Sequence, residues 1–475
     1  MLKQCIFLLW GYVTLLILGC LHISLADTVN VTTADDLINL FSNATGNTLQ
    51  TGIEVTADLD FSGSNLTLPL GVIPNNTCVA FSGVFHGNGY SIKGLRMNNI
   101  YNEEYKNAGL FCNLKDAVIE NLIIDSSCVF IGAQSAALSV TVTGSLFVNN
   151  VTNYASVNGT QKVASLISSV EIAQQRNTAL SFSNSVNHGL IVGNKSFVGG
   201  FIGSINHNKG ITILFENMTN VNQVSGPQFV GGMIGEITNN DNFVLTIEKS
   251  TNGFVISSAG INSVGGFLGS CSNSQYYVSR VALTFINSIN TRPLTCQDAS
   301  AVGGFVGSLF NIKSIIMKQC ENLEALNATG TDIGIGGLIG LFNGNMNIII
   351  NPQIIIEGSE NSGNINATSN ATSDVSGLVG SIQSSLNIAI TIEKSINSAR
   401  VIESYGTGNS HSGGLVGSFT GNGNMKVDVS GCLNSGAISS SMQSNSLGGL
   451  IGHLSENAQS KITLNDVTNN GTICP

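Results

Sequence analysis

The sequence predicts an all-β protein, most of which is a parallel β-solenoid of about ten coils. Two observations predict this fold. A five-residue pattern, Gly-Gly-Φ-Φ-Gly with Φ an apolar residue, returns along the chain, and an Asn returns in step with it. Composition agrees: the chain has 55 Gly, 6 Pro and only 10% charged residues. Its apolar residues lie in short β-branched stretches, which is typical of buried strands.

The glycine pattern occurs eight times, once with Ser as its first residue. Successive copies begin 32 residues apart at the closest (Gly199 to Gly231) and 40 at the widest (Gly336 to Ser376). Glycine allows a tight bend and leaves no side chain where the next coil passes, so we expect its second position to be structural. The predicted structural glycines are Gly200, Gly232, Gly266, Gly304, Gly337, Gly377, Gly414 and Gly449.

The Asn lies about 20 residues after most copies of the pattern, behind a strand-like alternation such as Leu245 and Ile247 before Asn252. Each unit therefore reads as three strands: the glycine motif, the alternating strand and a short strand after the Asn. Stacked coils place equivalent side chains about 4.8 Å apart, so the amides can bond one another as a ladder. The predicted ladder is Asn220, Asn252, Asn290, Asn322, Asn361, Asn397 and Asn434, with Asn153, Asn187 and Asn469 at the same spacing.

A β-propeller is the alternative architecture, because the period is also near that of a propeller blade. A blade needs four antiparallel strands joined by hairpins, and Asn-Gly or Asp-Gly hairpin signals are not regularly placed in this chain. The solenoid is therefore favoured.

The N-terminus has the pattern of a secretory signal peptide. Lys3 precedes an apolar stretch from Ile6 to Leu21, and Ser24 to Ala26 offer a small-residue cleavage site before Asp27. Lipidation at Cys20 and an uncleaved membrane anchor are the two alternatives. No later stretch is long and apolar enough to span a bilayer. Twelve glycosylation sequons are present, at Asn30, Asn43, Asn65, Asn75, Asn150, Asn158, Asn194, Asn217, Asn327, Asn366, Asn370 and Asn470.

Eight cysteines remain after Cys5 and Cys20, and none forms the C-x-x-C spacing of a zinc site. Two of them precede a predicted ladder Asn by two residues, and three coil steps put these two about 14 Å apart, too far for a disulfide. This pair, Cys320 and Cys432, is therefore expected to stay reduced and buried. Local bridges are expected instead, and the candidate pairs are Cys112 with Cys128 and Cys271 with Cys296.

Several functional classes are not supported by the sequence. A net charge of −10 with few basic residues argues against nucleic acid binding. The glycine patterns lack the Lys-Ser/Thr or acidic partner of a nucleotide site, and neither Gly-x-Ser-x-Gly nor a zincin motif is present. The histidines His86, His188, His207, His411 and His453 are interpreted as solvated or stacking residues. We predict no catalytic residue, no cofactor and no metal site.

Two acidic or oxygen-rich segments are the weak exceptions. Asp58 and Asp60 alternate as on a strand and could bind Ca²⁺, but a structural role in a cap is favoured. The stretch 239–242 (NNDN) could also supply oxygen ligands, and a solvated turn is favoured there.

Residues 81–98 (FSGVFHGNGYSIKGLRMN) and 108–124 (AGLFCNLKDAVIENLII), together with the repeats, resemble the GLUG-motif proteins, which are surface proteins of bacteria and protists. The resemblance implies a right-handed β-helix with an N-terminal cap on a secreted, often adhesin-like protein. No peptidase module or anchoring segment of the kinds found in that family is recognisable. The residues that carry the resemblance are Phe81, Gly83, Phe85, Gly87, Asn88, Gly89, Ile92, Gly94, Leu95, Gly109, Leu110 and Phe111.

We therefore divide the chain into a signal peptide (1–26), an N-terminal capping region (27–107) and GLUG-type β-solenoid repeats (108–475). The predicted function is a secreted or cell-surface, non-catalytic scaffold or adhesin that binds an extracellular protein or glycan. The alternatives are a carbohydrate-active β-helix enzyme, with acids converging on one side of adjacent coils, and a coat protein that associates end to end. The sequence ends within a coil, which fits either a longer chain or a docked end.

Overall fold

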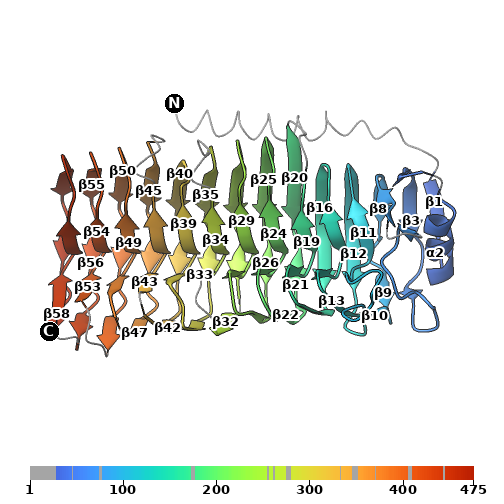
Figure 1. Ribbon diagram of the computed structural model, residues 1–475, viewed down its shortest axis with the longest axis horizontal. Helices are drawn as coiled ribbons and strands as arrows, with labels where there is room; N and C mark the ends of the chain where they lie inside the picture. Colours follow the sequence, from blue (N-terminus) through green and yellow to red (C-terminus); the bar gives the residue numbers. More distant parts are fainter. Residues whose placement is uncertain are drawn as a thin grey trace.

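The computed structural model describes residues 28–474 except 45, 74–76, 173–176, 254–255, 260–262, 274–279, 332, 345–350, 370, 405–408 and 442–443. They form a parallel β-solenoid of about 11 turns, stacked along one axis (Figure 1). Within these residues the one antiparallel pair of strands is β5 (Val72–Ile73) with β6 (Thr77–Cys78). The predicted fold class is confirmed.

One coil contains five strands, where the sequence predicted three. In the coil that begins at β23 (Val198–Gly199), the chain continues through β24 (Ile202–Asn206), β25 (Ile211–Glu216), β26 (Thr219–Asn220) and β27 (Val224–Ser225). The glycine motif is not one strand but the bend between β23 and β24, and the Asn forms a short strand of its own.

The five strands of each coil build four parallel sheets. The 10-stranded sheet contains β14 (Ser135–Ala136), β18 (Val163–Ala164), β23, β28 (Val230–Gly231), β33 (Ser263–Gly265), β38 (Ala301–Gly303), β43 (Ile333–Gly336), β48 (Ser373–Ser376), β53 (Asn409–Gly413) and β58 (Ser444–Gly448). The 13-stranded sheet contains β2 (Thr48–Leu49), β7 (Ala80–Phe81), β11 (Phe111–Leu114), β15 (Ser139–Val142), β19 (Ile167–Val170), β24, β29 (Ile234–Thr238), β34 (Leu268–Ser272), β39 (Val306–Phe310), β44 (Ile339–Asn343), β49 (Val379–Gln383), β54 (Val416–Thr420) and β59 (Ile451–Ser455).

The other two sheets complete the circumference. The 12-stranded sheet contains β10 (Arg96–Asn98), β13 (Val129–Gly132), β17 (Ser156–Gly159), β22 (Ile191–Gly193), β27, β32 (Ile256–Ala259), β37 (Leu294–Gln297), β42 (Leu326–Gly330), β47 (Ile365–Ser369), β52 (Val401–Ser404), β57 (Ile438–Ser440) and β62 (Ile473–Cys474). The 25-stranded sheet has one row of longer strands, which are β1 (Thr28–Val31), β3 (Gly52–Val55), β8 (Val84–His86), β12 (Ala117–Ile124), β16 (Leu146–Asn153), β20 (Thr178–Ser183), β25, β30 (Val244–Glu248), β35 (Ala282–Ile286), β40 (Ser314–Lys318), β45 (Gln353–Glu357), β50 (Ala389–Glu393), β55 (Lys426–Ser430) and β60 (Lys461–Asn465). Its second row begins with β4 (Leu59–Asp60) and β9 (Ser91–Lys93), continues through the ends of β12 and β16, and then contains the Asn-bearing strands β21 (Val186–Asn187), β26, β31 (Thr251–Asn252), β36 (Ile289–Asn290), β41 (Glu321–Asn322), β46 (Glu360–Asn361), β51 (Ile396–Asn397), β56 (Leu433–Asn434) and β61 (Thr468–Asn469).

The core is the space inside the coils, and alternate residues of the long strands fill it. In β30, Leu245 and Ile247 are fully buried, while Thr246 between them is partly exposed. Phenylalanines stack from coil to coil: the rings of Phe267 and Phe305 are parallel at 4.6 Å. Burying each such side chain contributes roughly 2–3 kcal/mol, so the stack stabilises every coil against its neighbours.

A second backbone feature repeats three residues before the Asn. There the chain adopts a left-handed conformation, as at Asn217 (φ 54°), Lys249 (φ 49°) and Asn287 (φ 49°). This residue turns the chain from the long strand into the short Asn-bearing strand. Asn and Gly are the residues that adopt it most readily, which explains their frequency at this position.

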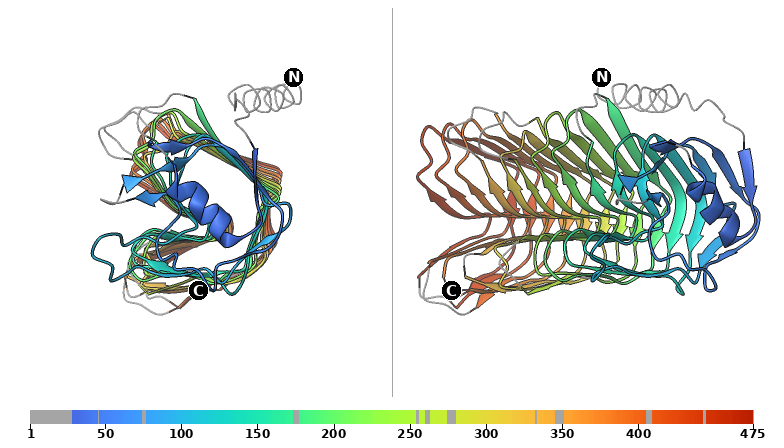
Figure 2. Two further views of the ribbon diagram at one scale, coloured as in Figure 1. Left: turned by 90° about the vertical axis from the view of Figure 1, so that its right-hand side faces the viewer. Right: turned by 45° about the vertical axis from the view of Figure 1, so that its right-hand side comes forward.

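The helix α2 (Ala34–Ser42) covers the N-terminal end of the solenoid, as the view along the axis shows (Figure 2). Thr33 and Asp36 form a capping box at its first turn. Its buried Phe41 packs at 5.8 Å from Phe111 and 6.0 Å from Phe81, so the helix closes the core. No helix among the described residues is long and apolar enough to cross a membrane.

The region expected as a separate cap, 27–107, is continuous with the repeats. Strand β1 pairs in parallel with β3, β3 pairs with β8, and β8 pairs with β12 beyond residue 108. The cap proper is therefore α2, and parallel stacking extends back to β1.

Candidate functional site

The Asn ladder runs through the interior without a break from Asn153 to Asn469. Each side-chain Nδ2 donates to the Oδ1 of the Asn in the next coil, at 2.7 to 3.1 Å. The seven predicted members are all fully buried, so the expected register is confirmed. An Asn amide can do this because it donates and accepts on opposite sides, and each rung satisfies the next.

The structural glycines face this ladder from across the interior. A Cβ on Gly304 would lie 2.7 Å from Cγ of Asn322 and would overlap the carbonyl oxygen of Gly337 in the next coil. A Cβ on Gly414 would lie 2.5 Å from Cγ of Asn434. The expected close approach of the next coil is therefore present. The sequence did not predict that the same glycine also makes room for the ladder Asn of its own coil.

Outside the glycine bend, the 10- and 13-stranded sheets turn their outward side chains toward each other, and we call this surface the outer corner. Contacts across it show how close the two walls are: Lys162 Nζ lies 2.9 Å from Ser169 Oγ, and the rings of His411 and His453 stack at 3.9 Å. One wall consists of Lys162, Phe197, Phe229, Ser263, Ala301, Gly334, Asp374, His411 and Ser446. The facing wall consists of Ser169, Ser204, Glu236, Ser270, Ser308, Leu341, Ser381, Ser418 and His453.

A buried carboxyl group lies near one end of the outer corner. Glu236 is only 7% exposed and makes no hydrogen bond or ion pair with any residue that the structure describes. Burial raises the pKa of Glu236 to about 7, and the nearby Lys162 opposes this shift only in part. Its burial could not be predicted from the sequence, since a lone Glu in a strand is ordinarily exposed.

A second polar cluster lies near the other end of the outer corner. His411 Nδ1 is 2.7 Å from Asp374 Oδ1, and Ser381 Oγ is 2.9 Å from Ser418 Oγ. Burial and the adjacent His411 lower the pKa of His453. Both serine side chains are completely buried, and among the described residues neither forms a hydrogen bond with His411. The cluster therefore contains the residue types of a hydrolase without the nucleophile–base contact that such chemistry uses.

A third carboxylate, Glu403, faces the interior instead of the surface. It accepts hydrogen bonds from the hydroxyls of Ser373, Ser410 (2.5 Å) and Ser412 (2.8 Å). Burial raises the pKa of Glu403 despite these donors. It lies on the opposite face of the 10-stranded sheet from Asp374, so the two acids do not form one site.

Acidic residues of adjacent coils do meet on the outer face of the 25-stranded sheet. Glu216 and Glu248 are register partners on β25 and β30, and Lys249 Nζ lies 3.1 Å from the first and 3.2 Å from the second. This is the kind of convergence that the enzyme alternative expected. The group lies on an exposed surface, where Lys249 is half exposed and neutralises both carboxylates.

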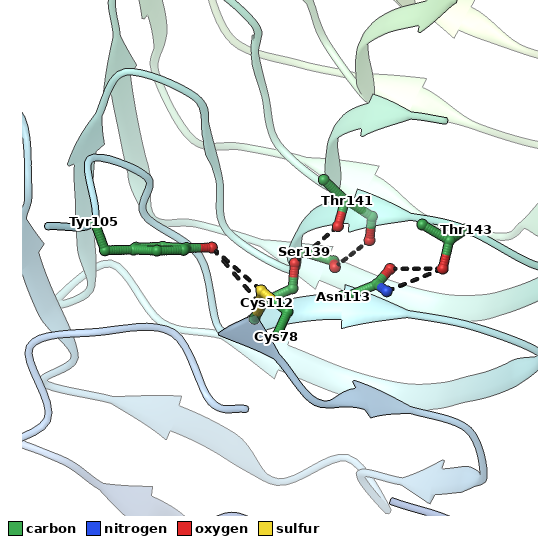
Figure 3. Close-up of a disulfide and its surroundings, with 7 residues drawn as sticks. All are labelled: Cys78, Tyr105, Cys112, Asn113, Ser139, Thr141 and Thr143. Carbon is green, nitrogen blue, oxygen red and sulfur yellow. Dashed lines mark hydrogen bonds between the residues drawn. A yellow bond between two sulfur atoms is a disulfide. The ribbon is translucent and has the colours of Figure 1, made fainter. Parts of the chain in front are cut away.

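The cysteine predictions are partly corrected. The disulfide joins Cys78 to Cys112, with Cα atoms 5.9 Å apart and the hydroxyl of Tyr105 beside the sulfurs (Figure 3). Cys128, expected as the partner of Cys112, is buried and free, because Cys78 lies one coil away from Cys112 and beside it. The second expected bridge is also absent from the described residues: Cys271 lies in the 13-stranded sheet and Cys296 in the 12-stranded sheet, and both are free.

The other two cysteines behave as expected. Cys320 and Cys432 are free and buried. Each thiol donates to the carbonyl oxygen two residues earlier, at 3.5 and 3.3 Å, as Ser395 does in its own coil at 2.9 Å. Burial raises the pKa of Cys320 to about 12, so the thiol is unreactive.

Three of the histidines stack as predicted. His411 lies against His453, and His188 lies against Tyr154 with ring centroids 4.7 Å apart. His86 differs, because it lies between Glu120 at 3.2 Å and Glu54 at 3.8 Å. His207 occupies a left-handed turn (φ 55°) after β24.

The two oxygen-rich segments make internal contacts. Asp58 pairs with Lys93 at 2.5 Å, and Asp60 accepts the backbone N–H of Ser62 at 2.8 Å, consistent with a structural role at the N-terminal end. In the 239–242 stretch Asn240 is 2% exposed and joins a second, shorter ladder, in which it accepts from Asn208 at 2.9 Å. The expected solvated turn is therefore wrong for Asn240, whereas Asn239, Asp241 and Asn242 are partly or fully exposed. No group of three His, Cys, Asp or Glu among the described residues could hold a metal ion.

A search of protein-family models finds no match, and neither does a search of curated protein sequences. Among solved structures, the chain is similar to a Bacteroides ovatus protein whose crystal structure is titled a "putative immunoglobulin A1 protease". The two are 13% identical, the similarity covers 57% of this chain and 77% of that one, and the TM-score is 0.44. A similarity of this size says nothing about activity, and the resemblance to GLUG-motif proteins stays a prediction.

Proposed function

We propose that this protein is a secreted or cell-surface scaffold of the adhesin type, which binds extracellular macromolecules without transforming them. The outer corner is the binding surface. One observation carries the proposal: along this corner the side chains change chemistry from coil to coil, while the inward side chains that follow them in the 10-stranded sheet are apolar in every coil except that of Ser412. Basic, aromatic, small, acidic and imidazole groups follow one another at equivalent register positions, and the chain is left-handed at two of them, Phe197 (φ 58°) and Phe229 (φ 47°).

The distribution of sequons supports the same face. Asn75 and Asn370 lie outside the described residues, and the other ten are partly or fully exposed. None of these ten lies in a strand of the 10- or 13-stranded sheet. Asn327 and Asn366 are register partners on the 12-stranded sheet, so any glycans there would cover that face and leave the outer corner bare. The N-terminal segment, which lies outside the described residues, supports secretion by its sequence alone.

The proposal is tested by immobilising the full chain and measuring binding to extracellular-matrix proteins and to a glycan array. We expect saturable binding to at least one partner. A Ser446→Arg substitution in the outer corner should abolish it, whereas Thr295→Arg on the exposed face of β37 should not. Binding that survives the first substitution and is lost with the second would move the site to the 12-stranded sheet.

A carbohydrate-active enzyme remains the second candidate, and Glu216, Glu248 and Lys249 are the observation that favours it. Two carboxylates beside a cation on neighbouring coils are the groups that acid–base cleavage of a glycosidic bond uses. Incubation with a panel of acidic and neutral polysaccharides distinguishes the two functions. Release of reducing or unsaturated ends that is lost in Glu248→Gln would establish the enzyme and overturn the scaffold.

A further inference from the structure

Three acceptor groups without hydrogen-bond partners gather in the outer corner on two adjacent coils. Ser204 Oγ and Asn206 Oδ1, on β24, are buried atoms with no partner among the described residues. Glu236, the register partner of Ser204 on β29, is also without one. Buried polar atoms normally find partners, because each one left alone costs about 1–3 kcal/mol. Two such atoms beside a carboxylate that has no hydrogen-bond partner among the described residues indicate a missing ligand.

The chain contains its own example of what would satisfy them. One coil earlier, Lys162 reaches into the corner, and its ammonium contacts Ser169 Oγ at 2.9 Å and Glu171 Oε1 at 2.6 Å. Ser169 is the register partner of Ser204, and Glu171 occupies the position of Asn206. The next coil thus repeats the acceptors of this lysine site.

The lysine itself is not repeated. Lys162 precedes Val163, and the register partner of Val163 is Val198, which is preceded by Phe197. In the following coil the same place is taken by Phe229, and the two rings stack at 5.7 Å. A Cβ on Gly235 would lie 2.9 Å from the carbonyl carbon of Phe197, so the backbone beside Glu236 passes close to the backbone of Phe197. The later coil therefore keeps acceptor groups equivalent to those that bind Lys162, but it has no lysine to donate to them.

We propose that this place, formed by Ser204, Asn206 and Glu236 beside Phe197 and Phe229, binds the ammonium group of a lysine side chain on a protein partner. An ammonium group carries three N–H donors and no acceptor, which matches three unpaired acceptors. The aromatic rings pack against the methylene stem and attract the cation.

The shape of the corner favours lysine over an amino sugar. Glu236 is 7% exposed, so only a slender chain reaches its carboxylate, and the four methylenes of lysine are such a chain. A pyranose ring bearing an amine directly would meet the phenylalanines first. The net charge of −10 also favours a basic partner. The inference rests on the proposed binding function and names its partner chemistry.

The first experiment titrates the full chain at pH 8 with Nα-acetyl-lysine methylamide and, as a control, with the norleucine analogue, which has the same stem without the ammonium. We expect saturable binding of the lysine probe by ligand-observed NMR, and binding of norleucine weaker by at least about tenfold. Glu236→Gln should weaken the lysine probe by a similar factor, while Glu324→Gln at an exposed position after β41 should not. Equal binding of both probes, or of neither, would overturn the proposal.

The second experiment restores the internal lysine. Phe197→Lys puts a lysine one residue before Val198, as Lys162 stands one residue before Val163. Its ammonium should compete for the three acceptors, so the variant should lose the lysine probe and melt at a higher temperature at pH 8. Phe197→Met, which stays apolar, should keep the probe. Undiminished binding by Phe197→Lys would refute the site, as would glucosamine binding better than the lysine probe. Retained macromolecule binding in a variant that has lost the probe would refute this inference and leave the scaffold function standing.

Discussion

The interior Asn ladder and the outer corner run along the same stack of coils. The ladder has the same residue in every coil, whereas the residues of the outer corner differ from coil to coil. Asn is present in ten successive coils of the ladder, from Asn153 to Asn469, whereas the outer corner passes from Lys162 through phenylalanine and small residues to His411. A buried position must have its polar groups satisfied from within, and Asn does this with copies of itself. An outward position can be satisfied by water or by a partner. A constant residue is therefore expected where a position serves folding, and the variation along the outer corner supports the binding role proposed for it.

The largest effect is expected where the ladder and the glycine bend touch. Gly304→Val should cost more than about 4 kcal/mol, or prevent folding, because its β-carbon would overlap the backbone of Gly337 and crowd Asn322. Gly63→Val is the matched control, since no atom lies within 4 Å of a Cβ there. Thermal denaturation of the two variants provides the measurement, and equal melting temperatures would show that the bend is not packed as described.

Ser418, which comes directly after the glycine motif that ends at Gly417, would be an unsuitable control. The structure places it in β54, completely buried and 2.9 Å from Ser381 Oγ.

Removing one rung of the ladder should have the next largest effect. Asn322→Ala would leave Asn290 Nδ2 without its acceptor and Asn361 Oδ1 without its donor, both in the core. We expect a loss of about 3–5 kcal/mol in the free energy of unfolding, measured by denaturant titration. Asn366→Ala removes a similar amide pair, Asn366 with Asn327 at 2.8 Å, from the partly exposed 12-stranded sheet. If Asn366→Ala lowers the free energy of unfolding as much as Asn322→Ala does, burial of the amides is not the reason why the ladder stabilises the fold.

Regular repetition explains how much of this structure could be predicted. The ladder and the second glycine of each motif were predictable because one residue returns at one position in many coils. The disulfide was not, since the sequence gives no sign that Cys78 lies beside Cys112 in the next coil. The outer corner was not predictable either: Glu236 and Asn206 belong to no repeating pattern, and only the bend between two sheets brings them against Phe197.

A smaller effect, dependent on pH, is expected from Glu236 in the outer corner. Its pKa is about 7 in the folded chain against an ordinary 4.5, so between these values the folded state holds a proton that the unfolded state has lost. Stability should therefore fall as pH rises from 4.5 to 7 and level off above that. Glu236→Gln should remove this part of the pH dependence. The free energy of unfolding of the variant and of the wild type is measured by denaturant titration at pH 4.5 and at pH 8. From the lower to the higher pH, the variant should become about 2–3 kcal/mol more stable relative to the wild type. If the difference in stability between the variant and the wild type is the same at both pH values, Glu236 is not a buried carboxyl group without a partner.

The smallest effect is expected at a cysteine that belongs to the constant part of the fold. Cys320 precedes Asn322 by two residues, and Ser288 and Ser359 occupy the same position in the coils on either side. Because serine there donates to the carbonyl two residues earlier, Cys320→Ser should change stability by less than about 0.5 kcal/mol.

Cys271→Ser makes the same atomic change in a different setting. Cys271 lies between Ile237 and Leu309 in the 13-stranded sheet, where neither neighbour offers a hydrogen bond. A hydroxyl buried there without a partner should cost about 1–3 kcal/mol. Denaturant titrations of the two variants test whether hydrogen bonding to the carbonyl determines which residues stand two positions before each ladder Asn. If Cys320→Ser is more destabilising than Cys271→Ser, packing of the sulfur, and not the hydrogen bond, determines the residue at that position.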